Sequence, residues 1–494
     1  MSREGQTGSG ARKLVVIGGG LSGLSAAYRI VERQDSRRPV ELILLEASAR
    51  TGGIVRTKRR EGFLLEAGPD AFIREKPAAL KLAERLGLGA RLIETNAAHR
   101  RSFVARGARL HPTPEGFQLI APTRLRPFLN SQIFSWAGKA RVALDLLLPR
   151  RRRRDGEDDD DESLASFVRR RLGREALERM AQPMVGGIYT ADPELLSLRA
   201  TMPRFLEMER ERRSLILALR ARAHSENGRG DDSRLASGAR YNLFLSFDEG
   251  MQVLTDALAA RLPRDTVRLG TRAENLKFDA AARRWEVETN AGERLSADGV
   301  VIALPAYAAA GLVRATDATL ATELDSIAYA SSATINLAYR REDIAHRLDG
   351  FGFVVPFVER RTLLACTFAS VKFAGRAPEG HALLRAFVGG ALQPDKLALD
   401  DDEMTAAVRR DLRELLGLNR TPLFAMVKRW PRSMPQYTVG HLACLARIRE
   451  RLAAHASLRL AGNAYDGTGV PDCVRSGEEA ADHLLDMTGD DAHD

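Results

Sequence analysis

The feature of this chain that most constrains its fold is a glycine-rich turn near the N-terminus, in the stretch KLVVIGGGLSGLSAAYRI. The apolar run 14–17 suits a buried parallel strand, and residues 22–31 can continue as a helix. Between the two, Gly18, Gly20 and Gly23 satisfy the pattern GxGxxG. Glycines at this spacing allow a tight turn and a close approach of a pyrophosphate to the N–H groups that begin the helix. The turn therefore predicts a dinucleotide-binding βαβ unit.

A second strand with an acidic residue at its end strengthens this prediction. The run ELILLEA occupies 41–47, and Glu46 lies 23 residues after Gly23. A carboxylate at this place can accept hydrogen bonds from the ribose hydroxyls of an adenine dinucleotide. The alternative is a solvated glutamate on an ordinary βαβ unit. The expected dinucleotide contacts are Gly18, Gly20, Leu21, Ser22, Gly23, Glu46 and Ala47.

The residues after this strand indicate a flavin rather than a nicotinamide cofactor. In ASARTGGIVRT, the pair Gly52 and Gly53 lets the backbone lie against a flat ring system, and Arg50 can reach a phosphate. The pattern LLEA-xx-R-x-GG resembles the FAD-dependent amine oxidase superfamily. A turn such as that in GFLLEAGPDAF (62–72) lies near the flavin in this superfamily. The resemblance therefore implies flavin contacts from Gly68, Pro69 and Asp70.

A second glycine-rich turn lies near the C-terminus, in LRLAGNAYDGTGVPDCVRSGEEAADHLL. An apolar run at 458–460 precedes it, and Asp472 can cap a helix over about 473–487. A second nucleotide is less favoured, because the spacing is not GxGxxG. The N–H donors of a helix N-terminus suit the negative pyrimidine end of a reduced flavin. An ordinary loop before a terminal helix stays the alternative. The expected flavin contacts here are Gly462, Asn463, Gly467, Val470 and Pro471.

Composition narrows the class of protein. The 494 residues suffice for about three domain-sized units. The net charge of +10 is spread along the chain without a nucleic-acid-binding motif, so no nucleic-acid partner is expected. The three cysteines form no CxxC pair, which fits a reducing compartment and argues against a flavin disulfide reductase.

The sequence favours a cytoplasmic protein. Residues 1–11 are expected to be a disordered leader, because they lack the apolar core of a secretory signal. No run reaches the roughly 18 apolar residues of a membrane span. The nearest, 299–313, is broken by Pro305 and is expected to be a buried strand that runs into a loop. A peripheral contact with the cytoplasmic membrane stays open.

The C-terminal stretch GNAYDGTGVPDCVRSG closely resembles the signature of the oxygen-dependent, FAD-containing protoporphyrinogen oxidase family. Five further segments resemble that family in the same order, so the resemblance covers nearly the whole chain. They are GPDAFIREKPAAL (68–80), GGIYTADPELLSL (186–198), FDEGMQVLTDAL (247–258), DGFGFVVP (349–356) and WPRSMPQYTVGH (430–441). The departures are mostly insertions, at 150–162 and 225–238.

This resemblance implies a two-part α/β flavoprotein, with an FAD-binding and a substrate domain, that also carries a helical lobe. A discontinuous Rossmann-like FAD-binding domain would take 12–90, 240–310 and 425–494, with Ala273 beside the adenine. A helical, membrane-associated lobe would take 91–239, and a mixed-sheet substrate domain 311–424.

Two segments of the lobe leave alternatives open. The run RRRRRDGEDDDDE (150–162) is a solvated linker or, less favoured, a contact for anionic lipid. The segment 131–149 is an interfacial helix or a core helix of the lobe.

The resemblance also implies a reaction. Hydride leaves a bridge carbon of protoporphyrinogen IX, a pyrrole N–H proton departs, and repetition gives protoporphyrin IX in heme biosynthesis. Oxygen reoxidises the flavin and yields hydrogen peroxide. Because aromaticity drives the reaction, we assign no general base. The nine histidines show no metal-ligand spacing, so no metal is expected.

The expected substrate contacts follow from the same resemblance. Arg74 is the first candidate for a propionate carboxylate and Lys76 the second. The other expected contacts are Gly187, Ile188, Ala306 and Phe351.

Several alternatives remain. Coproporphyrinogen III has the same ring with four propionates instead of two, and the motifs do not separate the two substrates. An amine oxidase or a carotenoid desaturase fits the C-terminal signature less well. A non-catalytic flavin-binding partner of a heme-pathway enzyme is the alternative from another class. A homodimer or a transient contact with the next heme-pathway enzyme is a further expectation.

Overall fold

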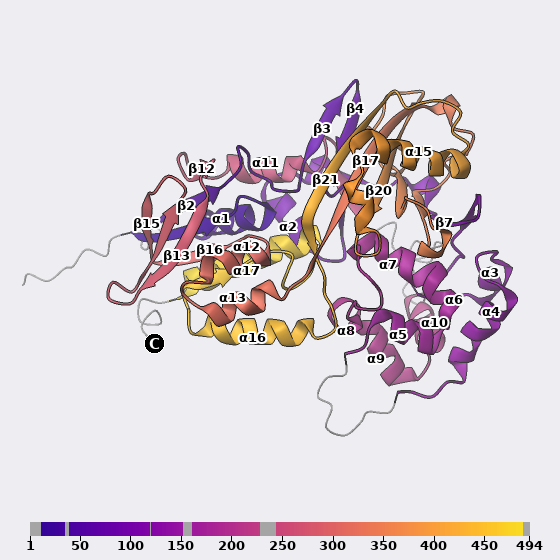
Figure 1. Cartoon of the computed structure of the whole chain (residues 1–494), viewed down its shortest axis with the longest axis horizontal. Helices are drawn as coiled ribbons and strands as arrows, with labels where there is room; N and C mark the ends of the chain where they lie inside the picture. The colour runs from indigo at the N-terminus through magenta and orange to yellow at the C-terminus, as the bar shows by residue number, and fades with distance from the viewer. Residues whose placement is uncertain (1–10, 35–38, 119, 152–160, 228–243, 488–494) are drawn as a thin grey trace, which may run out of the picture.

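A parallel five-stranded sheet lies in the left part of the molecule as drawn in Figure 1. The computed structural model describes residues 11–34, 39–118, 120–151, 161–227 and 244–487. The strand order is β12-β2-β1-β16-β22, and every neighbouring pair is parallel. Segments far apart in the sequence therefore build one Rossmann-like sheet. Its strands are β1 (Arg12–Ile17), β2 (Val40–Glu46), β12 (Val267–Leu269), β16 (Gly299–Ile302) and β22 (Leu458–Leu460).

Helices cover both faces of this sheet, which explains why its strands are apolar without alternation. Leu14 and Val16 face one helix layer, and Val15 and Ile17 face the other. The first layer contains α1 (Leu21–Arg33), α2 (Ala78–Arg85), α11 (Gln252–Ala260) and α17 (Val470–Asp486). The second contains α12 (Ala306–Val313), α13 (Ala318–Asp325) and α16 (His441–Ala453).

The segment 299–313 differs from its prediction. It is a buried strand followed by the helix α12 rather than by a loop. Pro305 precedes the first helical residue with a φ of −54°, a value that a helix start accommodates. The proline therefore ends the strand and begins the helix, and the alanines that follow favour helix.

The second large sheet of the fold is mixed and has seven strands, in the order β21-β17-β20-β19-β18-β7-β8. All pairs are antiparallel except β18 with β7. The helix α15 (Asp401–Leu416) packs on one face. The strands are β7 (Phe103–Arg106), β8 (Arg109–Pro112), β17 (Tyr329–Arg340), β18 (Gly352–Val354), β19 (Ala365–Phe368), β20 (His381–Gly389) and β21 (Phe424–Pro435).

This sheet crosses the predicted domain boundaries. The strands β7 and β8 were expected in the helical lobe, and most of β21 in the FAD-binding domain. Strand pairing explains the difference, because β21 pairs with β17 from Tyr329 to Ala338 although about ninety residues separate them in sequence. Pairing with a distant strand leaves no local signal in the sequence.

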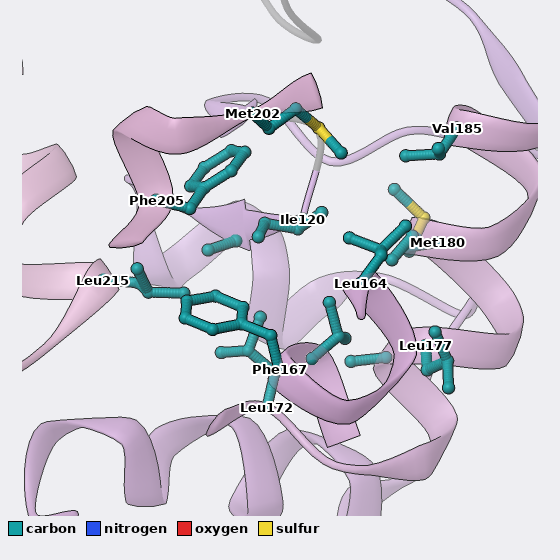
Figure 2. Packing of buried hydrophobic residues seen from close by; sticks show 14 of the residues in the cluster. Ile120, Leu164, Phe167, Leu172, Leu177, Met180, Val185, Met202, Phe205 and Leu215 are labelled. Atoms are coloured by element: carbon teal, nitrogen blue, oxygen red, sulfur yellow. The ribbon is translucent and has the colours of Figure 1, made fainter. Parts of the chain in front are cut away.

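Helices dominate the described residues from 125 to 227, whereas 92–122 forms strands. A buried cluster holds these helices together (Figure 2), with Phe167 and Phe205 fully buried at its centre. Arg171 and Asp145 form a buried ion pair beside the cluster. The helices are α3 (Leu125–Asn130), α4 (Trp136–Ala143), α5 (Leu164–Arg171), α6 (Arg174–Ala176), α7 (Gln182–Tyr189), α8 (Leu198–Thr201), α9 (Pro203–Arg212) and α10 (Leu215–Asn227).

The segment 131–149, predicted as either an interfacial helix or a core helix, has features of both. Phe134 and Val142 are buried in the cluster, while Trp136 and Leu147 are 74% and 73% exposed. No helix in the described ranges is long and apolar enough to cross a membrane. Residues 1–10, 152–160 and 228–243, which include most of the expected leader and most of both expected insertions, lie outside the described residues.

Short strands complete the fold. A hairpin pairs β3 (Thr57–Arg60) with β4 (Phe63–Glu66). The three-stranded antiparallel sheet β13-β14-β15 follows the edge strand β12 along the chain. The remaining strands are β5 (Phe72–Ile73), β6 (Leu92–Glu94), β9 (Phe117–Gln118), β10 (Ala121–Pro122), β11 (Phe244–Phe247), β13 (Ala273–Asp279), β14 (Arg284–Thr289) and β15 (Arg294–Ala297).

Candidate active site

The first glycine turn joins β1 to α1 at the carboxyl end of the parallel sheet. Gly18 has a φ of +106°, and a Cβ atom there would lie 2.6 Å from the carbonyl oxygen of Ala303. A Cβ atom on Gly23 would lie 1.8 Å from the Gly18 carbonyl oxygen. Only glycine fits these two positions. By contrast, no atom lies within 4 Å of a Cβ placed on Gly20, so space for a ligand opens there.

Glu46 ends β2 next to this turn. Its carboxylate accepts hydrogen bonds from the backbone N–H groups of Gly19 (2.8 Å) and Ser48 (2.7 Å). The Glu46 carbonyl accepts from the N–H of Thr271, two residues before Ala273. The turn, the acid and Ala273 therefore lie at one edge of the parallel sheet, as a bound adenosine would require.

The loop after β2 is folded against the first turn. A Cβ on Gly53 would lie 3.2 Å from the Cα of Gly20, and the N–H of Gly52 donates to the Gly19 carbonyl at 2.8 Å. The Arg50 guanidinium donates to backbone carbonyls of this same loop, including Thr51 at 2.7 Å. Arg50 therefore shapes the loop, and its expected phosphate contact stays a prediction.

The turn at 66–70 connects this loop to the mixed sheet. A Cβ on Gly68 would lie 1.8 Å from the Ile54 carbonyl oxygen, so the turn lies directly on the glycine-pair loop. On the opposite side of the turn, side chains of the mixed sheet donate hydrogen bonds to the backbone carbonyls of the turn. Trp430 Nε1 (2.7 Å) and Thr334 Oγ1 (3.0 Å) donate to the Ala67 carbonyl. Asn336 Nδ2 donates to the Glu66 carbonyl at 3.0 Å, and Arg385 donates to that of Gly68.

Asp70 is the last residue of this turn. Lys372 Nζ lies 2.9 Å and Arg385 Nη1 3.5 Å from its carboxylate. Burial raises the pKa of Asp70, but the two cations outweigh burial and lower the pKa to about 2. Two cations therefore share one carboxylate beside the turn, which leaves a positive surplus there.

The C-terminal turn lies between β22 and α17. Tyr437 holds it from the side, because its hydroxyl donates to the Asn463 carbonyl and accepts from the Gly467 N–H, both at 2.8 Å. Burial raises the pKa of Tyr437, so the hydroxyl stays protonated. Gly462 and Gly467 have φ values of +137° and +125°. The glycines therefore serve backbone conformations that other residues rarely adopt.

The helix α17 begins earlier than its prediction. Val470 and Pro471 are its first residues, and Asp472 takes part in the capping box from the first turn, while Gly469 holds the N-cap position. Asp472 accepts from the N–H of Gly469 at 3.1 Å and pairs with Lys76 Nζ at 2.7 Å. The proline accounts for the earlier start, because it fits the first turn of a helix, where its missing N–H needs no partner.

The two predicted propionate cations already have carboxylate partners. Arg74 pairs with Glu94 at 2.8 Å, and both side chains are about half exposed. Lys76 pairs with Asp472, which is 4% exposed. Both side chains are therefore paired with a carboxylate in this structure. A propionate-binding role for Arg74 or Lys76 stays a prediction.

The other predicted substrate contacts lie at separate places. Gly187 and Ile188 end α7 and are exposed, with Ile188 48% accessible. Ala306 begins α12, and its N–H donates to the Tyr329 hydroxyl at 2.8 Å. Phe351 is 4% exposed, and it precedes β18 in the mixed sheet.

A cavity of about 540 Å³ lies next to the C-terminal turn. Its lining comes from the loop after α7, the start of β17 and the end of β21, and includes Ala191, Tyr329 and Tyr437. It contains none of the six predicted substrate residues, but it adjoins α7 and shares Tyr437 with the turn.

The mixed-sheet residues of this site were not predicted as contacts. Thr334, Asn336, Arg385 and Trp430 come from three strands that meet only in the folded sheet. Polar residues within otherwise apolar strand sequences, such as ATINLAY and LLRAFVG, are the one sequence signal that marks them. His441 is also buried, stacked on Tyr437 at 4.1 Å. Burial lowers the pKa of His441 to about 4, so its imidazole is neutral near pH 7.

Comparison with known proteins defines the class first. A family model described as flavin containing amine oxidoreductase matches residues 21–485, and the chain belongs to this family. Its cofactor is FAD, and the glycine turns described above fit such a cofactor. Three features would hold it: the open space at Gly20, the carboxylate of Glu46 and the N-terminus of α17.

Full-length relatives then place the chain in the porphyrinogen oxidase group. It is 34% identical to the coproporphyrinogen III oxidase of Bacillus subtilis (strain 168), over 96% of this chain and 98% of that protein. It is 36% identical to that of Propionibacterium freudenreichii, over 96% and 90%. A crystal structure from Exiguobacterium sp. 255-15, provisionally assigned as a protoporphyrinogen oxidase, superposes with a TM-score of 0.84 at 31% identity, covering 97% of this chain and 100% of that one.

The chain is thus an FAD-dependent porphyrinogen oxidase of heme biosynthesis. The comparisons leave the particular substrate open but change the order of the two candidates. Protoporphyrinogen IX was the first predicted substrate, and the bacterial relatives support the coproporphyrinogen III alternative better.

Proposed function

We propose that this chain oxidises coproporphyrinogen III to coproporphyrin III, with oxygen as acceptor and hydrogen peroxide as by-product. The observation that carries the proposal is the full-length similarity to two bacterial oxidases of that substrate. Protoporphyrinogen IX is the second candidate, because the Exiguobacterium structure carries that assignment.

Bound FAD would accept hydride from a bridge carbon of the macrocycle and pass the electrons to oxygen. The protein would contribute by positioning the macrocycle against the flavin. The turn 66–70 lies between the FAD-side loop 52–54 and the mixed sheet, so sheet side chains such as Trp430 and Thr334 fix its place. Holding reactants in the correct geometry supplies much of the rate enhancement in such reactions.

The N-terminus of α17 would add to this positioning. Tyr437 fixes the turn that precedes the helix, and N–H donors of the first turn favour negative charge. A reduced flavin carries that charge, so the helix would favour hydride acceptance. No side chain is assigned as general base, and the pyrrole N–H proton would leave to solvent.

The other parts of the predicted assembly stay proposals. They are a division into FAD-binding and substrate domains, whose limits would follow the two large sheets rather than the predicted residue ranges, and a helical lobe that contacts a membrane surface. A second copy of the chain or the next enzyme of the heme pathway would be a partner, and the cytoplasm the location.

Anaerobic mixing tests the proposal. FAD-loaded protein is mixed with coproporphyrinogen III in the absence of oxygen, and the visible absorption of the flavin is followed. We expect the flavin to bleach while porphyrin fluorescence rises, and to recover its colour when air is admitted. A flavin that stays oxidised with coproporphyrinogen III would overturn the proposal, and bleaching by protoporphyrinogen IX alone would favour the second candidate.

A further inference from the structure

The proposed function leaves the recognition of the substrate carboxylates open, because Arg74 and Lys76 already have carboxylate partners. Lys428 on β21 differs from both. It forms no ion pair with a carboxylate among the residues that the structure describes, and its side chain is half-buried. A lysine with no opposite charge beside it in a partly desolvated place is available to an anionic ligand.

Strand register puts Lys428 on the face of the mixed sheet that contacts the turn 66–70. It lies opposite Thr334, which in turn lies opposite Phe387 on β20. Thr334 donates to the carbonyl of Ala67, so the turn 66–70 lies on this face. The helix α15 packs on the other face, against residues such as Ile335 and Leu384.

Trp430 fixes the position of the ammonium without neutralising it. The Lys428 Nζ lies 4.7 Å from the centre of the Trp430 ring, a cation–π contact. The ring is itself held, because Trp430 Nε1 donates to the Ala67 carbonyl at 2.7 Å. The cation is therefore pre-positioned beside the turn, which lowers the entropy lost when it binds an anion.

The charges around the turn 66–70 also favour the binding of an anion. In the next row of the sheet, Arg385 is buried next to Asp70, whose carboxylate it shares with Lys372. Positive charge thus exceeds negative charge along this part of the face. A tetracarboxylate substrate gains more from such a field than a dicarboxylate.

We propose that Lys428 recognises a propionate carboxylate of the porphyrinogen and favours the substrate with four carboxylates over the one with two. This inference rests on the proposed function and names the specificity-determining residue of the same site. The ligand chemistry is a flexible carboxylate on the rim of an apolar macrocycle. Such a carboxylate can reach an ammonium that a tryptophan ring holds in place.

The test compares Lys428→Met and Lys428→Arg with the wild type, all loaded with FAD. The kcat and KM values are measured with coproporphyrinogen III and with protoporphyrinogen IX, and the Kd of coproporphyrin III is measured by fluorescence titration. We expect Lys428→Met to raise the KM for coproporphyrinogen III and the Kd about tenfold, as for loss of a charge-assisted hydrogen bond. The kcat should change little, protoporphyrinogen IX should be affected less, and Lys428→Arg should restore most of the binding.

The controls separate this inference from the proposed function. Lys277→Met removes an exposed lysine of β13 and should leave both substrates unaffected. Equal losses with both substrates, or an unchanged KM and Kd in Lys428→Met, would overturn the role of Lys428 while wild-type turnover upholds the proposed function. A larger selective effect from Arg74→Gln would transfer the role to Arg74. A wild type that oxidises neither porphyrinogen would instead refute the proposed function.

Discussion

Glu66 is a carboxylate placed where a carboxylate is costly. It is 3% exposed, and burial raises its pKa to about 7, although the Met251 N–H and the Thr57 hydroxyl bond to it. The folded protein therefore binds more protons than the unfolded chain between pH 4.5, the ordinary pKa of a glutamate, and about pH 7. Across that window the free energy of unfolding falls as the pH rises.

This gives a prediction for Glu66→Gln, which keeps the shape of the side chain but cannot ionise. Relative to the variant, the wild type should lose up to about 3 kcal/mol of stability between pH 5 and pH 8. Denaturant unfolding at the two pH values measures the difference. Glu94→Gln, an exposed carboxylate, is the control and should follow the wild type. Parallel curves for wild type and Glu66→Gln would contradict the pKa assignment.

Glu46 carries a second prediction at the scale of single residues. In Glu46→Ala the expected ribose acceptor is lost, and so are the hydrogen bonds to the N–H groups of Gly19 and Ser48. FAD affinity should fall at least about tenfold, measured by equilibrium dialysis of the released flavin. Glu41→Ala, which removes an exposed carboxylate of the same strand, should retain FAD. Full flavin loading of Glu46→Ala would contradict the assigned role.

At the scale of elements, α1 and α17 pack directly on one another, and each begins at one of the glycine turns. Gly477 makes this close approach possible, because a Cβ there would lie 2.2 Å from the Ser22 carbonyl oxygen. Ion pairs between Arg29 and Asp482 and between Arg33 and Asp486 line the same contact. The geometry of the two turns therefore depends on this helix pair.

Gly477→Ala should push the two helices apart. We expect a loss of about 2 kcal/mol in the free energy of unfolding and weaker FAD binding, because both cofactor turns move. Gly311→Ala in α12 is the matched control. No atom lies within 4 Å of a Cβ there, so it should stabilise the protein by up to about 1 kcal/mol. Unchanged stability and FAD affinity in Gly477→Ala would show that the helix contact does not set the turns.

Elements with local signals were the predictable ones. The strand β1, the helix α1 and the strand β2 all follow from apolar runs and glycine spacing close to where the structure has them. The starts of α12 and α17 were wrong, because Pro305 and Pro471 favour helix starts that were assigned to a loop or to a later residue. A single proline is compatible with both a break and a helix start, so spacing alone did not separate them.

At the scale of the whole molecule, the site depends on contacts that the sequence separates widely. The turn 66–70 touches β17, β20 and β21, which lie hundreds of residues later. Cofactor residues near glycine turns could be proposed from sequence, whereas Trp430, Arg385 and Lys428 could not. Their roles follow from strand register, and no local pattern encodes register between distant strands.

The wide separation of the site residues in sequence also explains why the sequence did not distinguish the two candidate substrates. The motifs that identify a porphyrinogen oxidase are expected to surround the flavin and the ring of the substrate, and the two candidate substrates share that ring. The difference between them lies only in carboxylates at the rim. Lys428, the cation that we propose for those carboxylates, lies outside the motifs, and Arg74, which lies inside one, pairs with Glu94.

One measurement tests the central claim most directly. Purified, FAD-loaded protein is supplied in air with coproporphyrinogen III and with protoporphyrinogen IX side by side, and kcat/KM is taken from the rise of porphyrin fluorescence above autoxidation. The account predicts turnover with a clear kcat/KM preference for coproporphyrinogen III. A preference for protoporphyrinogen IX would contradict the proposed substrate, and fluorescence no faster than autoxidation with both would contradict the proposed function itself.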